Sequence, residues 1–170
     1  VSADTFTRDV AATANLPGYT GFISNLGLVI WGATALLCLF GYRTIVGSTH
    51  KHRFLLSSAV LSAILGLDDM VLLHENILPE LLPQGEKIIY FLYGLMIVSY
   101  VWNFIDEIMK TDYFLFFGAL GLLGASLSID MVLPMTSLVT FLEDAFKFAG
   151  IALWLTYFFQ TLNQWLKQQA

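Results

Sequence analysis

Residues 112–133 read DYFLFFGALGLLGASLSIDMVL, and no charged side chain lies between Asp112 and Asp130. A helix that crosses a bilayer needs about 20 mostly apolar residues. A helix on the surface of a soluble domain has an apolar stripe on one face and polar residues on the other, whereas this segment has apolar residues on every face. The stretch therefore predicts a transmembrane helix.

Four other segments have the same character, and short connectors separate them. The predicted spans are roughly 21–45, 54–78, 87–108, 112–133 and 137–165. The connectors carry turn-forming or polar residues, which are Pro17-Gly18, GSTHKHR at 47–53, Pro79 to Gly85, and Pro134. We expect an all-α integral membrane protein, a bundle of about five transmembrane helices that forms a single domain over 21–165.

The composition agrees with a membrane protein. Hydrophobic residues make up 57% of the 170 residues and charged residues only 12%, with a mean hydropathy of +0.72. A soluble domain carries roughly 25% charged residues. The net charge is -5 and the basic residues are scattered, so nucleic acid is not an expected partner. The single cysteine, Cys38, can form no internal disulfide.

Basic residues near the helix ends predict the orientation, because five spans place the two ends of the domain on opposite sides. One side has Arg43, Lys51, Arg53, Lys110 and Lys167, and the other has only Arg8 and Lys87. Since cytoplasmic loops are enriched in Lys and Arg, we expect residues 1–20 outside and a cytoplasmic tail over 166–170. The expected location is a bacterial-type inner membrane or a plasma membrane.

Ionisable residues interrupt the apolar pattern at helix ends that meet on the outer side. The second and fourth helices end there, and the third and fifth begin there. The residues brought to this level are Asp68, Asp69, His74, Glu75, Glu86, Asp130, Glu143, Asp144 and Lys147. Charged groups within a bilayer normally face the bundle interior and have partners, so these residues are expected to form one site in the outer-leaflet half.

Helical phase suggests how the residues pair. Asp68 and Glu75 are seven residues apart and nearly superposed, whereas Asp69 points in another direction, so the second helix should contact two neighbours. Lys147 follows Asp144 by three residues and Glu143 by four and can neutralise either. The third helix aligns phenols that can donate hydrogen bonds to buried carboxylates, namely Tyr90, Tyr93 and Tyr100.

The carboxylates outnumber the cations, so the cluster needs protons or a bound cation. Oxygen ligands favour calcium, magnesium or manganese, and iron becomes possible if His74 turns inward instead of reaching the interface. The predicted metal ligands are Asp68, Asp69, His74, Glu75, Asp130, Glu143 and Asp144. The predicted catalytic residues are Asp68, Glu143 and Lys147.

Three classes of function remain open at this point. The first is a divalent-cation-dependent hydrolase or another enzyme that acts on membrane lipid, with a carboxylate as general base. The second is a transporter or channel in which the carboxylates and a lysine relay protons or cations. The third is an accessory or assembly subunit, either of a homo-oligomer or of a larger membrane complex, whose buried charges fix the choice of partner.

Overall fold

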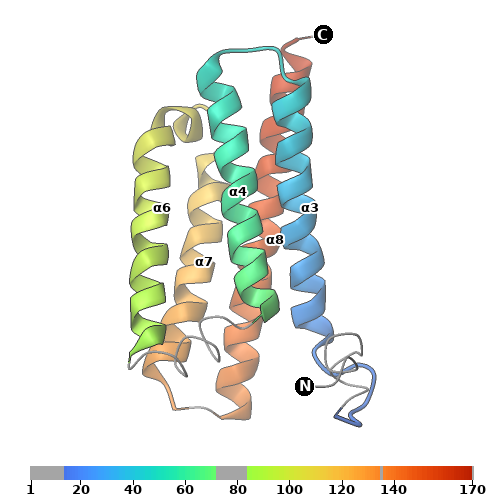
Figure 1. The fold of residues 1–170 in the computed structure, drawn as a ribbon, viewed down its shortest axis with the longest axis vertical. Helices are drawn as coiled ribbons and strands as arrows, with labels where there is room; N and C mark the ends of the chain where they lie inside the picture. Colours follow the sequence, from blue (N-terminus) through green and yellow to red (C-terminus); the bar gives the residue numbers. More distant parts are fainter. Residues whose placement is uncertain (1–13, 72–83, 135, 170) are drawn as a thin grey trace.

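The computed structural model describes residues 14–71, 84–134 and 136–169, and within these ranges the secondary structure is helical, with no strand (Figure 1). In the described part of the chain, five long helices follow one another in alternating directions. They are α3 (Phe22–Thr44), α4 (Thr49–Val71), α6 (Gly85–Met109), α7 (Tyr113–Val132) and α8 (Ser137–Lys167). The predicted all-helical fold is confirmed.

Local sequence signals explain several of the helix ends. The Asp112 side chain accepts a hydrogen bond from the backbone N–H of Leu115 and caps α7, and Thr136 caps α8 in the same way. Helix α7 ends before Pro134, because the residue before a proline is disfavoured in helical conformation. Helix α4 begins at Thr49, inside the segment predicted as a connector, and the Ser48 hydroxyl accepts from the N–H of Lys51.

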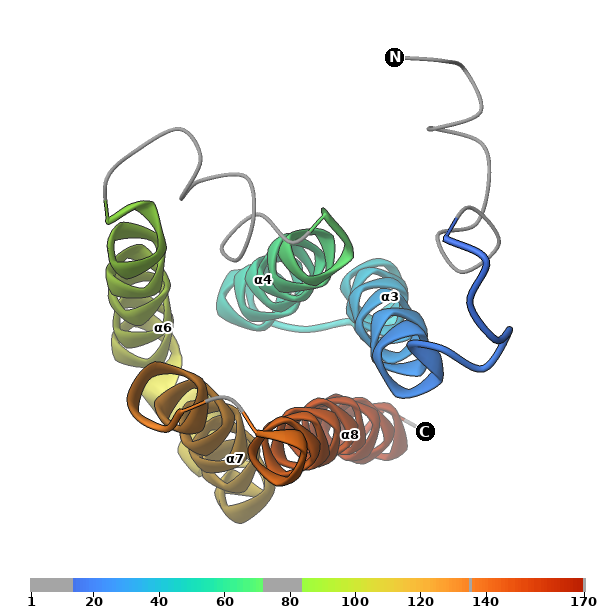
Figure 2. The ribbon, with the colours of Figure 1, turned by 90° about the horizontal axis from the view of Figure 1, so that it is seen from below.

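The helices form an incomplete ring when viewed along the bundle (Figure 2). Helix α8 packs extensively against α7 and α3, and α3 packs against α4. Helix α6 makes few contacts with α4 and α7. One side of the bundle, between α4 and α6, is therefore less tightly packed than the rest.

Aromatic residues fill the half of the bundle that lies toward the C-terminus, which we call the aromatic half. Most of its ring contacts are edge-to-face or tilted, and Tyr100 stacks on Phe116. The members are Phe54, Tyr100, Phe104, Phe116, Trp154, Tyr157, Phe158 and Trp165. Their polar atoms are satisfied internally: the Trp154 indole donates to Ser62 at 3.0 Å, and Tyr100 shares a 2.6 Å hydrogen bond with Ser58.

Glycines mark several close helix contacts, but Gly121 and Gly124 of the expected stripe on α7 are not among them. The run of small residues at 118, 121 and 124 predicts close packing of α7. A Cβ at Gly121 or Gly124 would meet no atom within 4 Å, so these two glycines do not contact another helix closely. For α7, the close approach is at Gly150 of α8, where a Cβ would lie 3.1 Å from the backbone nitrogen of Leu123.

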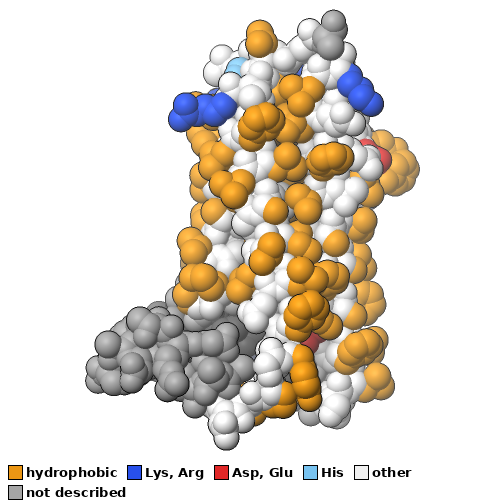
Figure 3. Space-filling model, turned by 90° about the vertical axis from the view of Figure 1, so that its right-hand side faces the viewer, with side chains coloured by type: hydrophobic (Ala, Val, Ile, Leu, Met, Phe, Trp, Pro, Cys, Tyr) orange, Lys and Arg blue, Asp and Glu red, His pale blue; other side chains and the backbone are white. Residues whose placement is uncertain are grey.

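The outer surface is apolar along its length. On the face shown in Figure 3, hydrophobic side chains extend along the bundle, and Lys and Arg side chains lie near the end that carries the C-terminus. Of the helices in the described ranges, four, α3, α4, α6 and α7, are long and apolar enough to cross a membrane, which indicates a membrane location. Helix α8 is not among them, because charged and amide side chains interrupt both of its halves.

Candidate functional site

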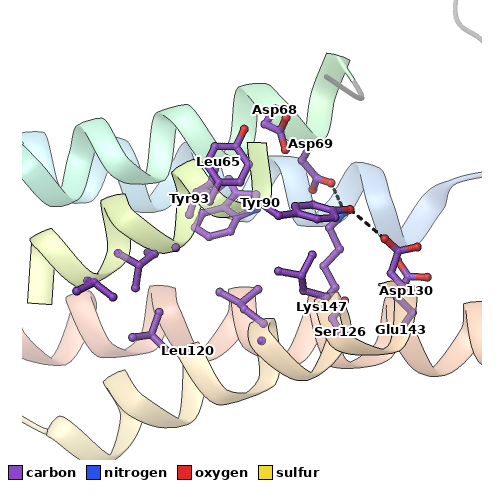
Figure 4. A pocket seen from close by; sticks show the side chains of 17 residues that line it. Leu65, Asp68, Asp69, Tyr90, Tyr93, Leu120, Ser126, Asp130, Glu143 and Lys147 are labelled. Carbon is purple, nitrogen blue, oxygen red and sulfur yellow. Dashed lines mark hydrogen bonds and ion pairs between the residues drawn. The ribbon is translucent and has the colours of Figure 1, made fainter. Parts of the chain in front are cut away.

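A pocket of about 380 Å³ opens between α4, α6, α7 and α8, and we call it the acidic pocket (Figure 4). Its polar lining comprises Asp68, Asp69, Tyr90, Tyr93, Ser126, Asp130, Glu143 and Lys147. The rest of its wall is apolar or glycine, including Trp31, Leu65, Gly94, Ile97, Val98, Leu120, Leu123, Gly124 and Leu127. It lies where α6 stands away from the other helices.

An ion pair between helices crosses one wall of the pocket. Lys147 of α8 pairs with Asp69 of α4, whose side chain is 6% exposed (Figure 4). The sequence predicted that Lys147 pairs with Glu143 or Asp144, which lie three or four residues before it on the same helix. Helical spacing gave no indication of a pairing with Asp69 on another helix. A buried carboxylate requires such a partner, because the desolvation of an isolated charge is costly.

Two phenols of α6 contact carboxylates on different helices. The Tyr90 hydroxyl donates a hydrogen bond of 2.9 Å to Asp130 of α7, and the Tyr93 hydroxyl bonds to the carboxylate of Asp68 on α4. The prediction that phenols of this helix bond to carboxylates is confirmed for Tyr90 and Tyr93, but it is wrong for Tyr100, which bonds to the Ser58 hydroxyl instead. Since Asp68 contacts α6 and Asp69 contacts α8, the polar arc of α4 also faces two neighbours, as expected.

The other acids of α8 lie on either side of this ion pair. Glu143 lines the acidic pocket, whereas Asp144 is exposed and borders a small adjoining hollow of about 20 Å³ with Asp69 and Lys147. The structure thus brings Asp68, Asp69, Asp130 and Glu143 to one pocket. It places Asp144 at the edge of that group.

Three residues of the predicted site lie wholly or partly outside the described residues. His74 and Glu75 lie outside the described residues, and the side chain of Glu86 is likewise not described. Within the described ranges, no group of three or more His, Cys, Asp or Glu side chains is placed to hold a metal ion. The metal and catalytic roles assigned from the sequence stay predictions.

The pocket changes from polar to apolar along the bundle axis. Its polar end is marked by Tyr90, near the start of α6, and by Asp130, near the end of α7. Its apolar end is marked by Val98 and Leu120, about 12 and 15 Å further along these helices. The polar end therefore faces the end of the bundle, and the apolar end points toward its middle.

A second polar cluster, which the sequence reasoning missed, lies at the opposite end of the bundle. Glu107 of α6 is 7% exposed; its carboxylate lies 3.4 Å from Nδ1 of His50 and 3.7 Å from the Lys110 ammonium group. Nearby, Thr111 and Tyr157 share a hydrogen bond of 2.8 Å. Glu107 and Lys110 are three residues apart on one helix, so this one contact of the cluster could have been predicted from the sequence.

The fold and the pocket define a class: an all-helical protein with membrane-type apolar helices and an acidic pocket between four of its helices. The chain belongs to the family described as a domain of unknown function (DUF8692), which matches residues 1–161. No curated protein and no solved structure gives a significant match.

Proposed function

We propose that the protein binds an amphipathic molecule with a cationic head group in the acidic pocket. The observation that carries this proposal is the gradient of the pocket, from carboxylates and phenols at one end to aliphatic side chains at the other. Pockets for small molecules commonly have volumes of about 300–1,000 Å³, with mostly apolar walls and a few polar groups that fix orientation. The acidic pocket has both features.

The charge of the lining favours a cation at the polar end. Among the described residues, four carboxylates and one lysine line the pocket. Ionised carboxylates in a site with little water require protons, a metal ion or an organic cation to offset their repulsion. A protonated amine can donate hydrogen bonds to Asp130 and Glu143, and the rings of Tyr90 and Tyr93 offer aromatic faces to a cation.

The apolar end suits a hydrocarbon group. The side chains of Ile97, Val98, Leu120, Leu123 and Leu127 form this part of the wall. A ligand lying along the pocket would keep its head group near the membrane surface and its tail in the membrane interior. This arrangement matches the orientation of a lipid in one leaflet.

The proposal includes five spans, with residues 1–20 outside and the C-terminal tail in the cytoplasm. The fifth span is supported by the packing of α8 along α3 and α7, two helices that are long and apolar enough to cross a membrane. Glu143 and Lys147 of α8 line the acidic pocket, so these two charged residues need not contact lipid, whereas Asp144 near the start of the helix is exposed. A cysteine at Val46, in the exposed α3–α4 loop, should be labelled from the cytoplasmic side only; labelling from outside would reverse the orientation.

Binding of dodecylamine to protein in phosphatidylcholine nanodiscs tests the ligand class. Asp130→Asn should weaken binding about tenfold, the effect of one charge-assisted hydrogen bond, while the amide oxygen still accepts from Tyr90. Asp106→Asn is the matched control, because Asp106 is exposed and does not line the pocket. Dodecanol should bind more weakly than dodecylamine, and dodecyl sulfate should not compete. Equal affinity in both variants would refute the proposed site.

A second candidate function is the relay of protons across part of the membrane. Its supporting observation is that three pairs of titratable residues surround one pocket: Asp69 with Lys147, Asp130 with Tyr90, and Asp68 with Tyr93. Proteoliposomes with an imposed pH gradient should then show a flux that Asp68→Asn abolishes. Absence of flux in the unsubstituted protein would exclude this function.

The predicted divalent cation can be tested on the same preparations. Elemental analysis should find calcium, magnesium, manganese or iron in stoichiometric amount, and Asp68→Asn and Glu143→Gln should remove it. A metal-free preparation that still binds dodecylamine would favour the organic cation over the metal.

A further inference from the structure

A second hollow, of about 430 Å³, lies between α4 and α6 in the other half of the bundle. We call it the Arg53 groove. Its α4 side presents Arg53, Ser57, Val60 and Ile64, which recur every three or four residues and so share one face of the helix. Its α6 side includes Asn103. None of its described lining residues also lines the acidic pocket.

Polar groups occupy one end of the Arg53 groove. Helix α4 begins and α6 ends at this end of the bundle, and Arg53, Ser57, Ser99 and Asn103 lie toward it. Asn103 donates to the carbonyl oxygen of Ser99 at 2.7 Å. Within the described part of the chain, Arg53 forms no ion pair, and no acidic side chain lines the groove. The guanidinium group is exposed and available to an anion.

The other end of the groove is apolar. Val60 and Ile64 are 51% and 39% exposed, and Met96 faces them from α6. From Arg53 to Ile64 the groove extends about 16 Å along the helix axis. Arg53 lies about 6 Å from the start of α4, within reach of the membrane surface for a side chain of this length.

We infer that the Arg53 groove binds an anionic phospholipid, with the phosphate on Arg53 and Ser57 and one acyl chain along Val60 and Ile64. Arginine presents a planar fork of donors that matches phosphate oxygens, and it keeps its charge at any physiological pH. The basic end of the groove lies at the level of lipid phosphates, and the apolar end lies at the level of the chains. An occupant with only one of these two features would leave half of the groove unmatched.

Native mass spectrometry of detergent-solubilised protein with phosphatidylglycerol or phosphatidylcholine tests this inference. The unsubstituted protein should retain phosphatidylglycerol preferentially. Arg53→Gln should reduce that preference about tenfold, because it removes the charge-assisted contacts to phosphate. Arg43→Gln is the matched control: Arg43 is an exposed arginine at the same end of the bundle, outside the groove, and its substitution should leave the preference unchanged.

A second variant tests the acyl-chain half of the groove. Val60→Trp fills the apolar end and should reduce retention of both lipids, whereas excess inorganic phosphate should not displace bound phosphatidylglycerol. Equal losses in Arg53→Gln and Arg43→Gln would assign the preference to the overall surface charge and overturn the inference. Full lipid retention in Val60→Trp, or displacement by phosphate, would overturn it as well.

Discussion

The aromatic half and the half that holds the acidic pocket are built from the same helices but packed in different ways. In the aromatic half, Trp154, Tyr157 and Phe116 are fully buried, and their rings interlock. Around the acidic pocket, α6 stands away from α4 and α7, and the contacts that cross the space are hydrogen bonds and an ion pair. Stability thus concentrates in the aromatic half, whereas the other half holds the carboxylates and phenols of the acidic pocket.

This division has a physical cause in the side chains available to each half. Large rings fill space without requiring partners outside the core, so helices can close around them. Carboxylates need hydrogen-bond or ion-pair partners, or contact with water. Helices that carry carboxylates at the same position along the bundle therefore do not pack tightly there, and a space remains between them. The pocket is therefore the structural consequence of placing acids from α4, α7 and α8 at one level.

The largest expected effect is on stability, in the aromatic half. Trp154→Ala removes a fully buried ring and the hydrogen bond to Ser62, and it should lower the free energy of unfolding by about 3–5 kcal/mol. Trp102→Ala is the control, because Trp102 is 84% exposed, and it should change stability little. Denaturant titration in mixed micelles measures both. Similar losses in the two variants would contradict the proposed concentration of stability.

The ion pair of the acidic pocket should give the next largest effect. Lys147→Met leaves the buried Asp69 carboxylate without this partner and should cost about 2–3 kcal/mol, below the range for fully buried pairs because Lys147 is 28% exposed. The double variant Lys147→Met/Asp69→Asn should recover part of this loss, since it removes the stranded charge. A double variant less stable than Lys147→Met would contradict the pairing.

A smaller effect is expected where α7 and α8 approach most closely. Gly150→Ala should destabilise the protein by about 1–2 kcal/mol, because the new Cβ would meet Leu123. Gly121→Ala has open space around its Cβ and should be neutral or slightly stabilising, as alanine favours helix over glycine. Thermal unfolding of the two variants measures the difference. Equal midpoints would show that this helix contact is looser than described.

The smallest effect concerns the phenol at the mouth of the acidic pocket. Tyr90→Phe removes the hydrogen bond to Asp130 and should cost about 1 kcal/mol. Tyr19→Phe, at a position 78% exposed, serves as the control. Thermal unfolding should separate the two variants by a few degrees. A Tyr90→Phe midpoint equal to that of the unsubstituted protein would show that this hydrogen bond contributes nothing to stability.

Much of the fold followed from the sequence, because long apolar runs leave few alternatives to membrane-type helices. The sequence also predicted that Asp68, Asp130 and Glu143 lie at the same position along the bundle axis, because each helix runs opposite to the one before it. The phenols of α6 could be assigned to carboxylates because Tyr90 and Tyr93 share a helix face with the expected site.

The details that escaped prediction depend on how helices turn and tilt against one another. The spacing of residues along α8 predicted that Lys147 pairs with an acid of the same helix. The observed pairing with Asp69 depends on how α4 is rotated toward α8, which the spacing does not show. The separation of α6 from α4 likewise has no marker in the sequence. Small residues at 121 and 124 suggested a tight contact, whereas the position that α7 approaches is Gly150.

The opening of the acidic pocket is the central claim, and cysteine modification tests it most directly. In a Cys38→Ala background, cysteine is placed at Gly124, which lines the pocket, or at Gly121, three residues away and outside it. A cationic, water-soluble thiosulfonate should modify the cysteine at 124 about tenfold faster, because an acidic cleft concentrates cations. Equal rates, or faster reaction at 121, would contradict a water-accessible acidic pocket between α4, α6, α7 and α8.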